Sequence, residues 1–400
     1  MVVAGVIAEY NPFHLGHAHH LRETRRRGAT HIVAVMSGHF VQRGEPALLD
    51  KWTRTQAALL GGADLVLELP LPYAMATAQR FAFGAVAALD ALGCVDLLSF
   101  GSECADLQLL QAGERLLQGE EIRPHLAGFL AQGYPFPKAR QLAAQALGQE
   151  ELIPLLTKAN DILAMEYLAQ LKKVGSSIEP LAIPRMGAGH DACTPSGGFA
   201  SASWLREQIT GGQPWAEMVP PQAAALYSQA LEDGRGPVTL KALEKPILTT
   251  MRCLTPQGVQ DLPDLSEGLE NRLLAARGAC SLEELFGQIK TKRYPLARIR
   301  RLVLSAFLGI PEGLSSQRPP YLQVLGANER GFQLLSRAKG TATVPLSHSL
   351  AKLERQGSTA QKVAALQAHS GDLWALGLPK VGPTGLEYTH PPVFLRGEKG

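Results

Sequence analysis

Cysteine and long hydrophobic runs are both scarce in this 400-residue chain, and each scarcity excludes a class of protein. The five cysteines lie far apart and form no C-x-x-C pair, which argues against a structural zinc ribbon and fits a reducing compartment. No stretch approaches the roughly eighteen uninterrupted apolar residues that a membrane-spanning helix needs. The apolar run at residues 2–7 has no basic region before it and is soon followed by Asn11 and Pro12, so we expect a strand there and not a signal peptide. The sequence predicts a cytoplasmic protein with no membrane partner.

Net charge is also small, which limits what composition can say about partners. The formal charge of +3 does not by itself indicate a nucleic-acid partner. If Pro295 opens a helix, helical spacing turns Arg298 and Arg301 toward solvent. From composition alone, a solvated basic face is slightly favoured over a phosphate-binding surface. Arg298 and Arg301 belong to a local basic cluster, which has six basic residues and no acidic residue in twelve positions: Lys290, Lys292, Arg293, Arg298, Arg300 and Arg301.

The most regular feature of the sequence is an alternation of apolar, strand-like runs with helical patterns. Alternation at this spacing is typical of βαβ units, in which the turns at the carboxyl ends of parallel strands form a ligand crevice. We therefore predict an α/β fold with a Rossmann-like parallel sheet. The strand-like runs lie at residues 2–7, 31–36, 63–69, 95–100 and 178–184, and the helical patterns at residues 15–27, 51–60 and 77–92.

Glycine and proline accumulate just after residue 211, and we place a domain boundary there. Residues 1–211 form the predicted Rossmann-like domain, with a helical insertion near residues 105–150. Residues 212–400 form a predicted, mainly helical region with a contribution to RNA binding. A short β element is expected at residues 321–325, and the tail from Gly377 onward is expected to be irregular because it carries several prolines and glycines.

The tetrapeptide His14-Leu15-Gly16-His17 follows the first predicted strand and opens the first predicted helix. A helix N-terminus presents unpaired backbone N–H groups and the positive end of the helix dipole, so it suits a phosphate. His14 and His17 project to one side of the turn because they are three residues apart. Imidazole N–H donors there would stabilise the charge that develops on the oxygens of an attacked α-phosphate. A bare H-x-G-H match more often means a helix cap and a surface histidine, but the strand before it and the helix after it favour nucleotide chemistry.

A second segment, S-A-S-W-L-R at residues 201–206, resembles the I-S-S-T-x-x-R element of the H-x-G-H nucleotidyltransferase superfamily. Hydroxyls and a basic residue of that element hold the triphosphate, so the resemblance implies that Ser201, Ser203 and Arg206 bind phosphate oxygens. The alternative is a plain serine-capped helix. Beside the H-x-G-H motif, the phosphate interpretation is favoured.

Longer motifs resemble one family of this superfamily, the tRNA(Met) cytidine acetate ligases. The resemblance covers most of the chain and implies a two-step reaction. ATP and acetate give acetyl-adenylate and pyrophosphate, and the acetyl group then passes to N4 of the wobble cytidine of elongator tRNA(Met), forming N4-acetylcytidine. The motifs are E-Y-N-P-F-H-x-G-H at residues 9–17, V-M-S-G-x-F-V-Q-R-G-E-P at 35–46, S-F-G-S-E at 99–103 and R-M-G-A-G-H at 185–190, with further similarity at 266–272 and 289–294.

The family resemblance also implies a nucleotide site, residue by residue. Gly101 follows a strand, where the lack of a Cβ lets a nucleotide approach the backbone. Asn160 could offer amide groups to base or ribose, and it is also the expected N-cap of a helix. The alternative for Arg185 is a surface ion pair. The implied ATP-binding residues are Ile7, Ala8, Glu9, Tyr10, Asn11, Pro12, Phe13, His14, Leu15, Gly16, His17, Ala18, His19, His20, Gly101, Asn160 and Arg185.

In the implied mechanism, His14 and His17 are catalytic and stabilise the phosphoryl oxygens while acetate attacks the α-phosphorus. Arg206 or Arg185 neutralises the departing pyrophosphate. The sequence exposes no obvious base for the acetyl transfer, and positioning is expected to suffice. The residues expected to contact tRNA are Lys290, Lys292, Arg293, Arg298 and Arg301, through phosphates, with stacking and edge contacts to the exposed anticodon base.

The loop at residues 37–46 carries three residues without a firm role. Arg43 and Glu45 are candidates to order acetate, although a solvated loop charge is the commoner fate of such residues. His39 stands where the family motif commonly has Asn. No role is predicted for it.

Four histidines lie within residues 14–20, yet no H-E-x-x-H spacing supplies a third ligand, so no protein-bound metal is expected. Mg²⁺ is expected to accompany ATP as a counterion. Two rival functions stay open. One is a nucleotidyltransferase that joins AMP to a small phosphorylated substrate, and the other is a non-catalytic, nucleotide-regulated tRNA-binding protein.

Overall fold

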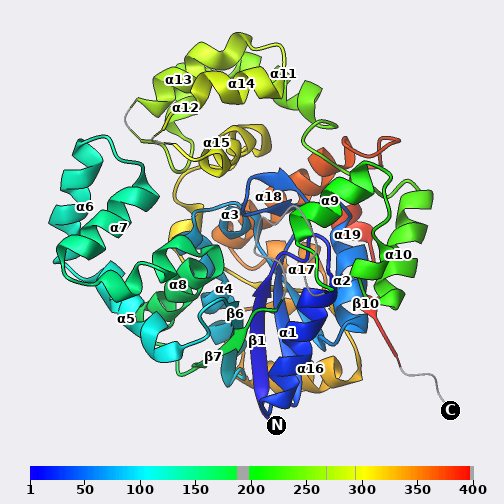
Figure 1. Cartoon of the computed structure of the whole chain (residues 1–400). Coiled ribbons are helices and arrows are strands. Elements are labelled where there is room, and N and C mark those ends of the chain that lie inside the picture. The colour runs from blue at the N-terminus through cyan, green and yellow to red at the C-terminus, as the bar shows by residue number, and fades with distance from the viewer. Residues whose placement is uncertain (187–197, 267, 293, 397–400) are drawn as a thin grey trace.

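The computed structural model describes residues 1–186, 198–266, 268–292 and 294–396 and is built around one central sheet (Figure 1). In this part of the chain, eight strands form the sheet in the order β10-β8-β5-β2-β1-β6-β7, with β9 beside β8. A separate hairpin consists of β3 and β4. The strands are β1 (Val3–Ala8), β2 (His31–Ser37), β3 (Phe40–Val41), β4 (Glu45–Pro46), β5 (Leu65–Leu69), β6 (Leu97–Ser102), β7 (Glu179–Pro184), β8 (Leu322–Ala327), β9 (Leu346–Ser347) and β10 (Val393–Phe394).

Strands β5, β2, β1, β6 and β7 are parallel neighbours, which confirms the predicted Rossmann-like sheet. The chain runs from β1 to β2 on one side and reaches β6 on the other side only later. β1 therefore stands at the point where the strand order reverses. In open α/β sheets, ligands bind outside the carboxyl ends of the strands at such a point.

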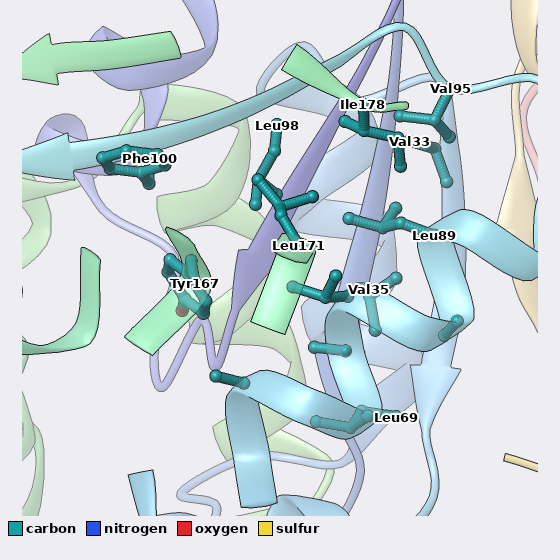
Figure 2. Packing of buried hydrophobic residues seen from close by; sticks show 14 of the residues in the cluster. Val33, Val35, Leu69, Leu89, Val95, Leu98, Phe100, Tyr167, Leu171 and Ile178 are labelled. Atoms are coloured by element: carbon teal, nitrogen blue, oxygen red, sulfur yellow. The ribbon is translucent and has the colours of Figure 1, made fainter. Parts of the chain in front are cut away.

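Alternate residues of the central strands enter two different cores, one on each face of the sheet. Val33 and Val35 of β2 pack with helices α4 and α8, as Figure 2 shows for this face. Ile32, Ala34 and Met36 pack on the opposite face with helices α1, α2 and α10. Because both faces are buried, apolar residues follow one another in these strands and do not alternate with polar ones. The helices that cover the sheet are α1 (Leu15–Arg26), α2 (Lys51–Leu60), α3 (Leu71–Ala74), α4 (Ala78–Leu92), α8 (Ala159–Val174), α9 (Ala202–Thr210), α10 (Pro221–Glu232) and α16 (Glu329–Thr341).

Two groups of helices extend beyond the sheet, as Figure 1 shows. The expected helical insertion and the expected helical region after residue 211 are both present. Among the described helices, none combines the length and the apolar character that a bilayer crossing requires. The insertion consists of α5 (Leu107–Gln118), α6 (Ile122–Ala131) and α7 (Phe136–Ala146). The second group shares a core with β3, α3 and α18 (Ser358–Ala375), and it consists of α11 (Glu244–Cys253), α12 (Pro256–Gln260), α13 (Leu269–Ala275), α14 (Leu282–Ile289) and α15 (Leu296–Leu308).

The C-terminal part of the chain returns to the sheet. The β element expected at residues 321–325 is β8, which pairs antiparallel with β5, so the sheet is mixed at this edge. The tail is not irregular as expected, because α19 (Leu386–Thr389) and β10 form after residue 377. A sheet that includes strands from residues 322–394 also crosses the boundary placed at residue 211, although the division into two domains stays a prediction. Two further helices, α17 (Leu350–Glu354) and α18 (Ser358–Ala375), lie between β9 and α19.

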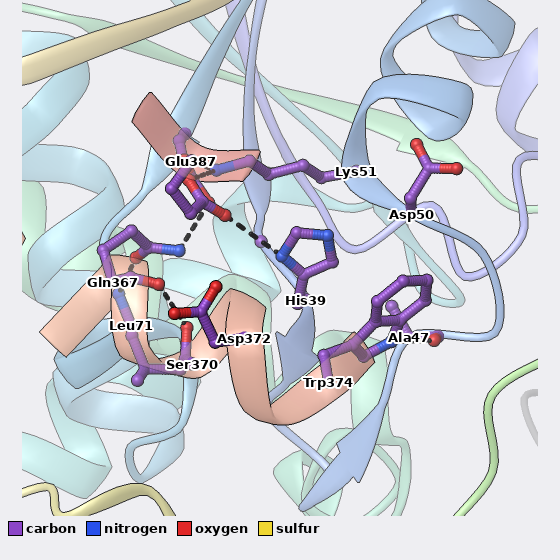
Figure 3. A network of polar contacts seen from close by, with 12 residues as sticks. His39, Ala47, Asp50, Lys51, Leu71, Gln367, Ser370, Asp372, Trp374 and Glu387 are labelled. Carbon is purple, nitrogen blue, oxygen red and sulfur yellow. Dashed lines mark hydrogen bonds and ion pairs between the residues drawn. The ribbon is translucent and has the colours of Figure 1, made fainter. Parts of the chain in front are cut away.

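A buried ionic cluster fastens the tail to the sheet (Figure 3). Lys51, at the start of α2, has no exposed surface and donates to Glu68 of β5 at 2.6 Å and to Glu387 of α19. Gln367 of α18 donates to the other oxygen of Glu68 at 2.7 Å. Burial raises the pKa of both carboxyls, and Lys51 opposes this rise. The cluster therefore joins residues that lie more than 300 positions apart in the sequence.

His39 lies against the same cluster, with its Nδ1 atom 3.2 Å from Glu387 Oε1. Its ring is tilted against that of Trp374, with centroids 4.7 Å apart, and Trp374 donates to the Ala47 carbonyl at 2.7 Å. Burial, reinforced by the charge of Lys51, lowers the pKa of His39 to about 3. The ring is therefore neutral and serves as a packing element of the loop that follows β2.

Replacement of His39 by Asn should make the free energy of unfolding fall less steeply as the pH is lowered. An unfolded histidine takes up a proton near pH 6.5 and folded His39 only near pH 3, so its contribution to stability is lost as pH falls through that window. His39→Asn removes this uptake and should reduce the slope by up to about 1.4 kcal/mol per pH unit between roughly pH 6 and pH 4. Urea unfolding at several pH values measures the slope. His348→Asn, at an exposed position, is the control, and equal slopes for wild type and His39→Asn would refute the assignment.

Candidate active site

A cavity of about 220 Å³ opens at the carboxyl ends of β1, β6 and β7. It brings together most of the predicted nucleotide-binding residues from five separate segments of the chain. Those in its lining are Ile7, Ala8, Glu9, Tyr10, Asn11, His14, Gly16, His17, His19, His20, Gly101, Asn160, Arg185 and Ser201. Of the other predicted residues, Pro12, Phe13, Leu15, Ala18, Ser203 and Arg206 do not line it.

The two motif histidines cap helix α1. His14 is the N-cap, and its Nδ1 atom accepts a hydrogen bond from Gly16 N at 3.0 Å. The His17 Nδ1 atom accepts from His14 N at 3.3 Å, which completes a capping box. The two rings lie 3.8 Å apart, centroid to centroid. Because each Nδ1 accepts, the neutral form of each ring carries its proton on Nε2, and neither capping bond involves that nitrogen. The cap and the anion-site interpretations of the motif are thus compatible.

Residues between β1 and α1 also anchor the motif, and of these Pro12 and Phe13 do not line the cavity. Phe13 is fully buried, and its backbone N–H donates to the hydroxyl of Tyr227 on α10 at 3.0 Å. The Asn11 side chain accepts from Leu48 N at 2.8 Å, and Tyr10 adopts the left-handed region with φ of 47°. These contacts hold the turn in one conformation. They explain why hydrophobic Phe13 stands next to a polar motif.

The β6 and β7 side of the cavity is organised by Glu103. Its Oε1 atom accepts from Asn160 Nδ2 at 2.5 Å and lies 3.7 Å from Arg185 Nε. A Cβ added to Gly101 would lie 3.2 Å from Arg185 Cγ, so the glycine leaves room for this side chain. We expected Asn160 to be the N-cap of its helix, but α8 begins at Ala159 and its cap is Lys158, two residues before Asn160.

Arg185 therefore makes an ion pair, which was the alternative to nucleotide binding, and it also lines the cavity. Its side chain retains 35% exposure. Burial lowers the pKa of its guanidinium, and Glu103 opposes this effect.

His20 and His19 contact the cavity from the second turn of α1. His20 Nε2 lies 2.9 Å from Ser99 Oγ, and Thr24 Oγ1 lies 2.6 Å from the same hydroxyl. Burial lowers the pKa of His20 to about 4, so its ring is neutral near pH 7. Across the described ranges, no group of three or more His, Cys, Asp or Glu side chains could hold a metal ion.

Ser201 is the N-cap of α9, which was the alternative to phosphate binding, and its hydroxyl accepts from Trp204 N at 3.1 Å. Arg206 lies behind the cavity wall, where it donates to the Asn11 carbonyl at 3.0 Å and to Ser203 Oγ at 3.2 Å. It also lies 3.4 Å from Glu45 Oε2. These contacts join α9 to the H-x-G-H turn and to the β3–β4 hairpin. A role for Arg206 and Ser203 on the triphosphate stays a prediction.

Several cavity residues were not singled out from the sequence. Gln42 lies within the loop motif at residues 35–46, so its neighbours signalled the region. Phe81 and Tyr167 had no signal, because an aromatic residue in an apolar helix pattern looks like core. The residues concerned are Gln42, Phe81, Phe100, Leu163, Tyr167, Ile183, Pro184, Met186, Phe199, Ala200 and Ala202, together with Arg43, whose role was left open.

The basic segment after residue 289 is only partly exposed. Arg301 is 9% exposed and donates to the Gln42 carbonyl at 3.2 Å, so the expectation that it points to solvent is wrong. The cause is the hairpin loop, which packs directly on α15: a Cβ at Gly44 would lie 2.7 Å from Arg301 N. Arg300 pairs with Glu45. Both arginines therefore tie the loop to the helical region.

The other basic residues keep more of their surface. Lys290 and Lys292 are exposed. Arg298 is half-buried, donates to the Asp264 carbonyl at 2.8 Å and lies over the ring of Tyr294. Arg293 lies outside the described residues. A tRNA contact by any of them stays a prediction.

An H-x-G-H turn that caps a helix at the reversal point of a Rossmann-like sheet defines a nucleotidyltransferase-type α/β protein. The HIGH Nucleotidyl Transferase family model matches residues 1–386. A tRNA(Met) cytidine acetate ligase from Thermoanaerobacter sp. (strain X514) is 38% identical over 99% of this chain and 100% of its own. The ligase of the same name from Caldicellulosiruptor saccharolyticus is 39% identical over 85% of both chains.

Solved structures agree with these sequence matches. The crystal structure of apo Thermotoga maritima TmcAL superposes with a TM-score of 0.93 at 33% identity and covers 99% of this chain and 100% of that one. TmcAL of the same organism bound with alpha-thio ATP gives a TM-score of 0.91 at the same identity. The chain therefore belongs to the tRNA(Met) cytidine acetate ligase family of HIGH nucleotidyl transferases, as its motifs predicted.

Proposed function

We propose that the protein activates acetate with ATP as acetyl-adenylate and transfers the acetyl group to N4 of the wobble cytidine of elongator tRNA(Met). The observation that carries the proposal is the His14–His17 pair, which lines the cavity at a helix N-terminus with both Nδ1 atoms engaged in capping bonds. The full-length similarity to proteins named tRNA(Met) cytidine acetate ligase supports the substrates. Because tRNA and ATP meet in the cytoplasm, we place the reaction there.

In the first step, an acetate oxygen attacks the α-phosphorus of ATP, and the bond to pyrophosphate breaks. His14 and His17 would donate to the nonbridging α-phosphate oxygens, whose charge grows in the transition state. Gly101, Asn160 and Arg185 would hold the nucleotide on the β6 and β7 side, consistent with the alpha-thio ATP bound by the Thermotoga relative. Mg²⁺ would arrive with ATP, bound by phosphate oxygens and water, and would offset triphosphate charge.

Acetate-dependent exchange of pyrophosphate into ATP tests the first step. The purified protein should exchange label only when acetate is present, because acetate supplies the nucleophile. A nucleotidyltransferase for a phosphorylated substrate would show no exchange with acetate, and a non-catalytic tRNA-binding protein would show none at all. Either result would replace the proposal.

For the tRNA surface, we propose the exposed residues Lys290 and Lys292 with the half-buried Arg298. Each lysine that neutralises a phosphate releases counterions, which makes binding salt-dependent. The double change Lys290→Ala and Lys292→Ala should weaken tRNA(Met) binding and reduce the slope of log K against log salt by about 1 to 2. Acetate-dependent exchange should be retained.

Filter binding or fluorescence anisotropy at several salt concentrations measures this slope. Lys339→Ala on α16, an exposed lysine on a different part of the chain, is the matched control. A double variant with the wild-type slope would place the RNA surface elsewhere on the molecule.

A further inference from the structure

Glu9 is a cavity carboxyl that the first reaction step does not use. It directly follows β1, between the histidine turn on one side and the β2 loop on the other. Its backbone is fixed because the Glu9 carbonyl accepts from Nη1 of buried Arg54 at 2.7 Å. Its side chain is fixed because Oε1 accepts from Gln42 N at 2.9 Å. Between residues that the structure describes, no hydrogen bond or ion pair reaches the other carboxylate oxygen, Oε2.

Charged and titratable groups from several elements face this carboxyl. Burial raises the pKa of Glu9, whereas Arg43, the Gln42 N–H and Arg206 lower it and Glu45 raises it again. The net effect is that the pKa of Glu9 lies above that of an ordinary glutamate. Tyr167 of α8 lines the same cavity, and burial together with the Glu9 charge raises the pKa of its hydroxyl. Glu9 is therefore a better proton acceptor than a solvated glutamate, while Tyr167 keeps its proton.

The proposed second step needs such an acceptor. The lone pair of a cytosine N4 amino group is delocalised into the ring, so the nitrogen is a weak nucleophile unless a proton leaves as the new bond forms. N4 attacks the acetyl carbonyl carbon, the N–C bond forms, and the bond between that carbon and the AMP oxygen breaks. The electron pair leaves with AMP, and one N4 proton must pass to a base. A positioned base contributes about 10²–10⁴ in rate to such a transfer.

We propose that Glu9 is the general base of the acetyl transfer and that its Oε2 atom takes the N4 proton. This inference rests on the proposed function. Its position supports the role, because β1 stands where the strand order reverses and Glu9 lies in the same cavity as the histidines that would hold the activated phosphate. Gln42 fixes Oε1 and so aims the carboxylate. A merely structural Glu9 would instead serve to balance the charge of Arg43.

Glu9→Gln separates these roles, because the amide oxygen can still accept from Gln42 N while the basic oxygen is lost. Acetate-dependent exchange reports any loss of ATP binding, because Glu9 also lines the nucleotide cavity, and it should fall far less than transfer does. Single-turnover transfer from preformed acetyl-adenylate to tRNA(Met) should fall roughly 10²–10⁴-fold. Glu329→Gln, at an exposed position of α16, is the matched control and should leave both steps unchanged.

The pH profile of single-turnover transfer gives a readout that a structural role would not move. A base acts when deprotonated, so the wild-type rate should rise with pH through a pKa above 4.5 and then level off. Glu9→Gln should lose this limb. Wild-type transfer by Glu9→Gln, equal losses in exchange and transfer, or a flat wild-type profile would each overturn the assignment. A wild-type protein without acetate-dependent exchange would instead refute the proposed function, so the two failures are distinguishable.

Discussion

His14→Asn and His17→Gln should each reduce acetate-dependent exchange by roughly 10²–10³-fold, the usual effect of losing one donor to a developing oxyanion. Both substitutions remove an imidazole Nε2–H from the start of α1 while keeping an acceptor for the capping box. Asn is a favoured N-cap, and Gln is a favoured third residue of that box. The helix should therefore form normally.

Ordinary alanine substitutions would confound this test. His14→Ala also removes the N-cap, which costs about 1 kcal/mol of stability. The capped variants should differ from wild type by less than that in urea unfolding and should bind tRNA(Met) with near-normal affinity. Exchange at the wild-type rate, or parallel losses of exchange, fold and tRNA binding, would show that the histidines are structural.

Lys51→Met should destabilise the protein by about 3–5 kcal/mol, the usual cost of breaking a buried charge pair from one side. Lys51 is completely buried and is the shared partner of Glu68 and Glu387. Without its ammonium group, two carboxyls remain in a site that is almost closed to water. Because they can be protonated, the loss should shrink as pH falls.

Urea unfolding measures this loss of stability, and two further variants make the test more specific. Lys51→Met combined with Glu68→Gln and Glu387→Gln should recover most of the stability, because no uncompensated charge remains. Lys241→Met breaks the exposed pair with Glu244 and should cost no more than about 1 kcal/mol. If Lys51→Met cost no more than this control, the cluster would not hold the tail to the sheet.

Features that depend on neighbouring residues could be predicted from the sequence. The middle of β2, Ile32 to Met36, is entirely apolar because both faces of the strand are buried, and this leaves a local pattern that identifies a strand. The H-x-G-H turn is likewise local, because its capping bonds join residues two and three apart. For the same reason Ser201 could be recognised as a cap.

Features that depend on distant residues could not be predicted. Glu387 looked like a charge in an irregular tail, yet it pairs with Lys51 across 336 positions. Arg301 lies on a helix whose pattern shows an apolar face, but no pattern reveals that the Gly44 loop covers its other face. Tyr167 could not be predicted as a cavity residue for a related reason, because the same face of α8 packs in a core and lines the cavity.

The proposed acetylation is tested most directly by nucleoside analysis of unmodified elongator tRNA(Met) after incubation with the protein, ATP and labelled acetate. We expect labelled N4-acetylcytidine at the wobble position, formed only when both ATP and acetate are present. Absence of label at that cytidine, in a preparation that binds both ATP and the tRNA, would contradict the proposal.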